Sequence, residues 1–228
     1  MHDVAANLEQ IQARVASALA KSGRAPGDAQ LIAVSKKQEA EKIRAAFDAG
    51  QAIFGESRVQ EARAKIPLLP SALRWHFIGH LQKNKIRHAL PLFELFHSVD
   101  SLALAQDIER IADEEGVRPR VLLEVNVAGE GSKIGFAPDK LRSEMEALLE
   151  LGRLEIEGLM AIPPLAPESE QTRPYFAKLR ELRDQVEQEF ALKLPQLSMG
   201  MSNDYEIALE EGATFVRVGT AIFGTRGK

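Results

Sequence analysis

A lysine stands at the end of a short apolar run near the start of the sequence. Residues 31–36 read LIAVSK, and a polar stretch follows from Lys36 onward. An apolar, β-branched run of this length, closed by polar residues, is typical of a parallel strand that leads into a helix. A partly buried amine at the end of such a strand could act as a nucleophile toward an aldehyde or ketone. An exposed lysine without a chemical role is the alternative.

Two later segments carry residue types that bind phosphate. Residues 198–204 read SMGMSND and residues 217–221 read RVGTA, and each follows a short apolar run. Free backbone amides at a helix start favour an anion, glycine permits close approach of the backbone, and hydroxyl groups add donors. Two ordinary turns between strand and helix are the alternative.

The arginine of the second segment restricts the choice of ligand. Arg217 lies two residues after Phe215 and two before Gly219, so these three positions are expected to face the same side of the strand. Beside Lys36, its charge would disfavour the protonated amine. A lysine next to a phosphate site fits two ligands, a sugar phosphate in a lysine aldolase or pyridoxal 5′-phosphate (PLP). A guanidinium can donate to a pyridine nitrogen, which favours PLP; a buried carboxylate partner for Arg217 is the alternative.

The order of the elements predicts how these residues come together. Apolar runs alternate with charged segments of helical periodicity, and eight strands in this arrangement predict a closed (β/α)8 (TIM) barrel with an additional N-terminal helix. A doubly wound open sheet is less favoured, because no glycine-rich dinucleotide motif follows the first strand. Barrel sites lie at the carboxyl ends of the strands. We predict strands near 31–36, 52–55, 75–79, 95–99, 120–127, 155–160, 196–199 and 215–218, and helices near 39–49, 57–66, 82–90, 101–115, 138–150, 172–190 and 203–211.

Several of these helix ends carry boundary signals. Ser57 with Gln60, and Asn203 with Glu206, have the spacing of capping boxes. Glycines that tolerate a left-handed turn follow four predicted helices, at Gly50, Gly116, Gly152 and Gly212.

The composition restricts the class of protein. The 228 residues are 45% hydrophobic, carry a net charge of -4 and include no cysteine. We therefore expect a single domain over 1–228 in the cytoplasm, without disulfides or a thiol nucleophile. The acidic charge argues against a nucleic-acid or membrane partner, and neither a signal peptide nor an apolar run of about 18 residues occurs. His76 and His80 are spaced like a zinc pair but have no evident third ligand, so no metal site is expected.

Several stretches of the sequence are specific enough to indicate a family. The chain resembles the pyridoxal phosphate homeostasis proteins over nearly its whole length. The matching stretches are AVSK (33–36), FGE (54–56), VQE (59–61), WHFIGHLQKNK (75–85), VNVAGEGSKIGF (125–136), GLMAIPP (158–164) and SMGMSNDYEIALEEGATFVRVGTAIFG (198–224).

This resemblance implies a fold-type III PLP barrel, like the N-terminal domain of alanine racemase. It implies that Lys36 holds PLP as a Schiff base and that Arg217 faces the pyridine nitrogen. It further implies a carrier that buffers PLP or delivers it to PLP-dependent apoenzymes. The phosphate would be held by Ser198, Met199, Gly219 and Thr220, with Ser202 and His76 as additional cofactor contacts.

Two positions depart from the family pattern. Ser57 stands where an asparagine is usual, so a cofactor contact by that amide is lost. Lys37-Gln38-Glu39 replaces the usual sequel to the cofactor lysine. A second basic group near the phosphate would therefore come from Lys37 or be absent.

An amino-acid racemase of the same fold type is the alternative function. A racemase needs a second acid or base opposite the cofactor lysine, commonly a tyrosine from an additional β domain. The sequence ends soon after the eighth strand, and Tyr205 is expected to pack rather than to donate a proton; Tyr175 lies in a periodic helix. We therefore expect a monomeric carrier. Lys133, in a glycine-containing loop, is a candidate second aldehyde acceptor during cofactor transfer.

Overall fold

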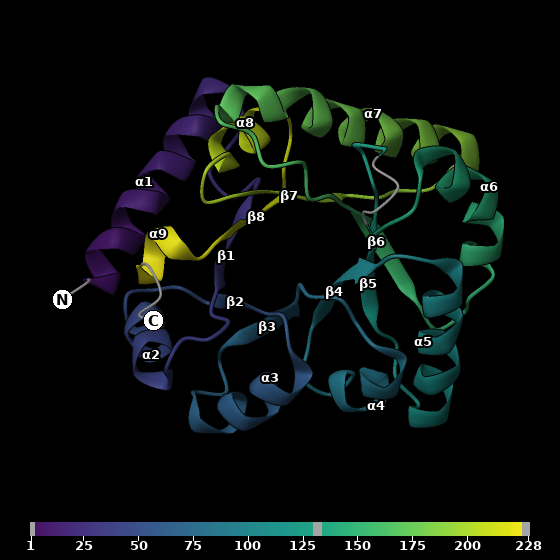
Figure 1. Ribbon diagram of the computed structural model, residues 1–228, viewed down its shortest axis with the longest axis horizontal. Helices are drawn as coiled ribbons and strands as arrows, with labels where there is room; N and C mark the ends of the chain where they lie inside the picture. The colour runs from purple at the N-terminus through teal and green to yellow at the C-terminus, as the bar shows by residue number, and fades with distance from the viewer. Residues whose placement is uncertain (1–2, 130–133, 225–228) are drawn as a thin grey trace.

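The chain folds into a closed barrel of eight parallel strands surrounded by helices (Figure 1). The structure is a computed structural model, and it describes residues 3–129 and 134–224. The strands pair in chain order, and β1 also pairs with β8 to close the barrel. They are β1 (Gln30–Val34), β2 (Ile53–Glu56), β3 (Arg74–Phe77), β4 (Leu95–Val99), β5 (Arg120–Glu124), β6 (Glu155–Met160), β7 (Gln196–Met201) and β8 (Phe215–Val218).

The helices form the outer layer and one of them precedes the first strand. They are α1 (Val4–Lys21), α2 (Ala40–Asp48), α3 (Val59–Lys65), α4 (Ile86–Ala89), α5 (Leu102–Glu115), α6 (Pro138–Leu149), α7 (Arg173–Phe190), α8 (Tyr205–Glu210) and α9 (Thr220–Phe223). Among the described residues, three short 3₁₀ helices complete the layer: η1 (Ile66–Leu68), η2 (Lys83–Lys85) and η3 (Ser169–Thr172). No helix in the described part of the chain is long and apolar enough to cross a membrane.

The alternation of side chains along the strands divides the core into two layers. One set of buried residues fills the barrel interior, and its neighbours in sequence pack outward against the helices. Phe215 belongs to the interior set, so Arg217, two residues later, also faces inward and is buried. The interior set is Ile32, Ile53, Leu95, Leu122, Met160 and Phe215. The predicted barrel is therefore confirmed, together with the inward direction of Arg217.

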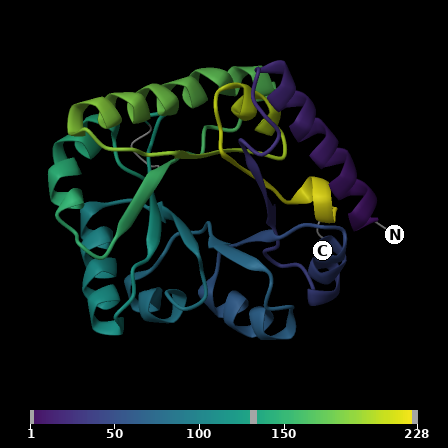
Figure 2. The ribbon, with the colours of Figure 1, turned by 180° about the vertical axis from the view of Figure 1, so that it is seen from behind.

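The N-terminal helix supports the segments that follow β7 and β8. In Figure 2, α1 runs beside the short helices α8 and α9. The Asn7 side chain donates to the Ile222 carbonyl at 2.9 Å, and Arg14 pairs with Glu206 at 2.7 Å. The buried face of α1, which includes Leu8 and Ile11, follows helical periodicity, as predicted from the sequence. This helix therefore covers the part of the outer layer that only short helices occupy.

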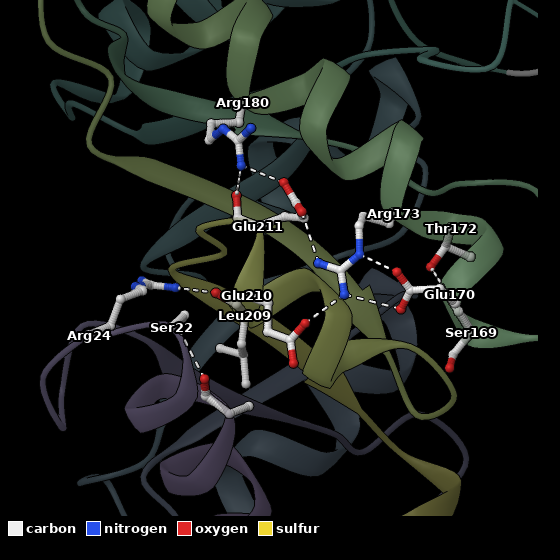
Figure 3. A network of polar contacts seen from close by, with 11 residues as sticks. Ser22, Arg24, Ser169, Glu170, Thr172, Arg173, Arg180, Leu209, Glu210 and Glu211 are labelled. Carbon is white, nitrogen blue, oxygen red and sulfur yellow. Dashed lines mark hydrogen bonds and ion pairs between the residues drawn. The ribbon is translucent and has the colours of Figure 1, made fainter.

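A polar network attaches the loop after β6 to the end of α8 (Figure 3). Arg173, at the start of α7, donates to Glu210 at 2.6 Å and to Glu211 at 2.9 Å, and it also pairs with Glu170. Arg180, two turns along α7, bonds the Glu211 carboxylate as well. Because Glu210 and Glu211 precede β8, the network fixes the loop after β6 relative to the last two strands.

The structure corrects both predicted capping boxes. Helix α3 begins at Val59 and α8 begins at Tyr205, and neither has a side-chain cap hydrogen bond. Glu206 pairs with Arg14 of α1 instead of its own helix start. A distant charged partner has therefore replaced the local bond that the sequence pattern suggests. Of the four predicted glycine exits, Gly50, Gly116 and Gly212 have positive φ.

Some predicted boundaries are also wrong. Strand β1 ends at Val34, so Lys36 lies two residues beyond it, and β5 ends at Glu124 rather than 127. The predicted helix 82–90 is divided between η2 and α4. Helix α9 was not predicted, since its four residues are too few to show periodicity.

Candidate functional site

A cavity of about 200 Å³ opens where β1, β7 and β8 reach their carboxyl ends. It contains the reactive residue types that the sequence singles out, an amine, a guanidinium and two hydroxyl groups. Its lining residues are Val34, Lys36, Gln38, Ile78, Ile162, Met201, Ser202, Arg217, Gly219, Thr220 and Gly224. Of the predicted cofactor residues, the fold thus brings together Lys36, Ser202, Arg217, Gly219 and Thr220.

Lys36 reaches the cavity because the strand alternation continues past the end of β1. Ile32 fills the barrel interior and Val34 lines the cavity, so the next residue of the same parity is Lys36. The intervening Ser35 is buried on the opposite side, and its amide donates to the Gly55 carbonyl at 3.0 Å. The lysine is therefore half-buried, with its side chain at the cavity and its backbone attached to β2.

The turn after β8 lies directly against the end of β1. A Cβ added to Gly219 would lie 3.2 Å from Val34 Cβ and 3.3 Å from its carbonyl oxygen, so a side chain would push the two segments apart. The Gly219 amide donates to Ser202 Oγ at 3.4 Å, which links the turns after β7 and β8. Glycine at this position therefore lets Ser202 and Thr220 share one wall of the cavity.

Arg217 forms the floor of the cavity. Its Nη1 donates to Ser198 Oγ, and its Nη2 donates to the Ala161 carbonyl at 3.0 Å. Burial lowers the pKa of Arg217 to about 10, opposed by the charges of Glu124 and Asp204, and the guanidinium stays protonated at neutral pH. The groups that accept from Arg217 are a hydroxyl and a carbonyl, and the predicted alternative, a direct carboxylate partner for Arg217, is not seen within residues 3–129 and 134–224.

A chain of hydrogen bonds continues from Arg217 into the barrel. Ser198 Oγ accepts from Arg217, so its own hydrogen is available to His97 Nδ1, 2.8 Å away. His97 Nε2 must then carry the hydrogen that it shares with His76 Nδ1 across 3.0 Å. Both imidazoles are neutral in this arrangement, in agreement with burial that lowers the pKa of His76 to about 4 and that of His97 well below its ordinary value. The chain therefore fixes the orientation of the guanidinium.

Three predicted residues do not line the cavity. Ser198 and His76 lie beneath it, in the chain that supports Arg217. Met199 has the opposite parity to Ser198, and its side chain is buried in the layer between the strands and the helices. A role for Met199 in phosphate binding would therefore have to use its backbone.

Several lining residues, and the supporting His97, were not predicted. Ile78 and Ile162 come from loops after the strands, where no periodicity indicates the direction of a side chain. Met201 ends β7, where the register with β8 is irregular between Ser198 and Met201. The inward direction of His97 could have been predicted, because His97 lies two residues after Leu95 in β4 and Leu95 faces the interior. A second inward histidine was therefore accessible from the sequence.

The remaining candidates lie elsewhere. The Tyr205 ring is buried beneath the Arg14 guanidinium, 5.3 Å from its centroid, on the side facing α1, as a packing role predicts. Lys37 is exposed, and Ser57 lines a separate cavity beside Arg58. Lys133 lies outside the described residues.

Acidification is expected to destabilise the fold through His76. The unfolded residue has a pKa near 6.5 but the buried one near 4, so the unfolded chain binds more protons between these pH values. This difference corresponds to a loss of about 3 kcal/mol in the free energy of unfolding as the pH falls through that range. Over the same pH range, the free energy of unfolding of a His76→Leu variant should fall by about 3 kcal/mol less than that of the unmodified protein. Urea unfolding over a pH series measures the difference, with the exposed His88→Leu as control; equal pH dependence in the two variants would contradict the prediction.

Comparisons with known proteins agree with this arrangement. The family model of the alanine racemase N-terminal domain matches residues 6–227. The alanine racemase of Clostridium difficile 630 superposes with a TM-score of 0.73 at 17% identity, covering 97% of this chain and 57% of that one, and shares the fold alone. The fold and site thus define a barrel of the alanine racemase N-terminal type.

Closer relatives narrow the assignment. A pyridoxal phosphate homeostasis protein of Aquifex aeolicus is 44% identical over 96% of each chain, and that of Escherichia coli K12 is 42% identical over 99% of this chain and 98% of the relative. PipY of Synechococcus elongatus PCC7942, solved with PLP bound, has a TM-score of 0.81 at 44% identity, covering 92% of this chain and all of that one. The chain belongs to the family of pyridoxal phosphate homeostasis proteins.

Proposed function

We propose that this protein binds PLP in the cavity between β1, β7 and β8, holds it through Lys36 as a Schiff base, and buffers or delivers the cofactor. The observation that carries the proposal is the meeting of Lys36, Arg217 and the turns after β7 and β8 in one cavity. The relatives' common name and the PLP bound to PipY support it.

The donor set fits the chemical groups of PLP. Lys36 supplies a primary amine, which condenses with the aldehyde carbon to form a C=N bond while the aldehyde oxygen leaves as water. Arg217 supplies a permanently charged donor suited to an unprotonated pyridine nitrogen. Ser202, Thr220 and the close backbone at Gly219 suit the phosphate. Ser198 and His76 belong to the chain that supports Arg217, and a phosphate contact by Met199 would use its backbone.

The surroundings of the cavity favour a carrier over a racemase. PLP supplies an electron-withdrawing ring that stabilises a carbanion when bound, but an arginine partner weakens this effect. A racemase also needs an acid or base opposite the lysine, and Tyr205 faces α1 rather than the cavity. Ile162, which lines the cavity, is 42% exposed, and an open wall of this kind suits the entry and release of the cofactor.

We propose, on the composition, that the protein is a single domain over 1–228, monomeric and cytoplasmic, with PLP-dependent apoenzymes as recipients and without nucleic-acid or membrane partners. Absence of cysteine suits a reducing compartment, and the net charge of -4 does not suit a polyanion.

Transfer of the cofactor tests this function. PLP-loaded protein is mixed with an apoenzyme that regains activity on binding PLP, while the same loaded protein is incubated with amino acids in deuterated water. We expect the apoenzyme to be activated and the amino-acid α-proton to exchange no faster than with free PLP. Enzymatic exchange, at rates on the order of 1 per second or more, would instead favour the racemase.

A further inference from the structure

A buried cluster of charges lies behind the lysine of the candidate site. Lys65, in the last turn of α3, places its Nζ 2.7 Å from Glu56 Oε1, 2.9 Å from Glu61 Oε1 and 2.9 Å from the Ser35 carbonyl oxygen. The Lys65 side chain is 9% exposed and that of Glu56 is fully buried. None of these residues lines the cavity that contains Lys36.

The cluster holds the residue before Lys36. Ser35 is buried on the outer face of the barrel end, where its hydroxyl donates to Glu56 Oε1 at 2.6 Å and its carbonyl accepts from Lys65. Glu56 ends β2, so the cluster joins the ends of two neighbouring strands to α3. Because Ser35 and Lys36 have opposite parity, fixing Ser35 on the outer face directs Lys36 toward the interior.

The same cluster holds the residue after Lys36. The Lys37 backbone amide donates to Glu61 Oε1, the oxygen that also accepts from Lys65. Lys37 has φ of 59°, a left-handed conformation that is unfavourable for a residue with a side chain. A strained backbone of this kind persists where the surrounding structure determines it. The two peptide neighbours of Lys36 are therefore bound to one set of charges.

Stability alone is a weak explanation for such a cluster. Burying ions is costly, and apolar side chains of similar volume often stabilise a fold as well or better. Here Glu56 Oε2 is buried and makes no hydrogen bond within the described residues, which adds to the cost, and burial raises the pKa of Glu56. Polar groups retained at such cost commonly fix one local conformation, in this case that of residues 35–37.

We propose that Lys65, together with Glu56 and Glu61, positions Lys36 for its reaction with an aldehyde by fixing the backbone on both sides of it. The inference rests on the proposed role of Lys36 and names Lys65 as a positioning residue outside the cavity. Removing Lys65 would break the bond to the Ser35 carbonyl and release the carboxylates of Glu56 and Glu61, which accept from Ser35 and Lys37. Residues 35–37 would then be held less tightly, and the amine would spend less time directed toward the cavity.

Two measurements on Lys65→Met test the proposal. The first is the rate at which PLP becomes attached to Lys36, trapped by borohydride and quantified on the Lys36 peptide. We expect a rate about 10- to 100-fold below that of the unmodified protein, the range that a small misplacement of a reacting group produces. The second is hydrogen exchange of the Lys37 amide in protein without PLP. We expect its protection to be lost, and this result requires no cofactor.

A second variant and two controls keep the test decisive. Glu61→Ala removes the acceptor of the Lys37 amide and should give the same two results. Because Glu61 is less buried than Lys65, this variant can replace Lys65→Met in the test if Lys65→Met does not fold. Arg120→Met removes a similar ion-pair centre at the amino end of β5, where Arg120 bonds Glu157 and Glu94, and should leave both measurements unchanged. The apolar triple variant Glu56→Leu, Glu61→Leu, Lys65→Met removes these acceptors as well as the charges, and should recover thermal stability but not the rate.

The outcomes separate the two proposals. If the unmodified protein never attaches PLP to Lys36, the proposed function fails, whatever the variants do. If the unmodified protein reacts and a folded Lys65→Met or Glu61→Ala reacts at the same rate, the positioning role is overturned. A triple variant whose rate recovers together with its stability would also overturn it, because the cluster would then only stabilise the fold.

Discussion

A Lys36→Ala variant is expected to lose its covalently held PLP while it retains its fold. Lys36 is half-buried and its side chain belongs to the cavity wall rather than to either core layer, so truncation removes the amine with little loss of packing. Arg217, Ser202 and Thr220 remain and can still bind PLP through hydrogen bonds. We expect retention to weaken by about 100-fold or more, equivalent to about 2.8 kcal/mol of binding free energy.

The adjacent lysine provides a matched control. Lys37 is exposed and does not line the cavity, and its contact with Glu61 uses the backbone amide, which alanine keeps. Equilibrium dialysis followed by absorbance of the bound cofactor should show normal retention in Lys37→Ala and loss in Lys36→Ala. Equal retention in the two variants would remove Lys36 from its assigned role.

A Gly200→Ala variant is expected to lose much of its stability and to have a distorted site. Gly200 has φ of +90°, and an added Cβ would lie 2.5 Å from Ala208 Cβ and 2.9 Å from Tyr205 Cα. Strain at this φ adds to a clash with helix α8, so we expect the free energy of unfolding to fall by about 3 kcal/mol or more. Because Ser202 follows two residues later, PLP retention should fall as well.

Gly212→Ala separates the two causes. Gly212 has a similar φ of +98°, but the nearest atom to an added Cβ is Arg180 Cδ at 3.7 Å. This variant should therefore lose only about 1 kcal/mol and keep its PLP. Urea unfolding of both variants measures the difference, and equal losses would mean that packing against α8 contributes nothing.

The sequence was sufficient for the barrel because its signal is repeated. Strands β4, β6 and β8 have the predicted bounds although each contains polar residues, because each short run with apolar residues lies between two segments of helical periodicity. Helix starts were less predictable. Glu206 pairs with Arg14, which lies 192 residues away in the sequence, and such a partner is known only once the fold is known.

Part of the candidate site could also be predicted from the sequence, and part could not. Lys36, Arg217 and Gly219 follow from strand parity and from the need for glycine at a close approach, both of which are local. Met199 was predicted from the family motif alone. The alternation of side chains along β7 directs its side chain toward the helices instead of the cavity. In the charge cluster of Lys65, the pair with Glu61 has the i,i+4 spacing of a helix, but the contacts with Glu56 and Ser35 depend on the fold and no spacing in the sequence indicates them.

Reduction of the PLP-loaded protein with borohydride, followed by proteolysis and mass spectrometry, tests most directly whether the amine beside Arg217 carries the cofactor. We predict one pyridoxyl group, found on the peptide that contains Lys36. A pyridoxyl group on a different lysine with Lys36 unmodified, or a protein that binds no PLP, would contradict the assignment.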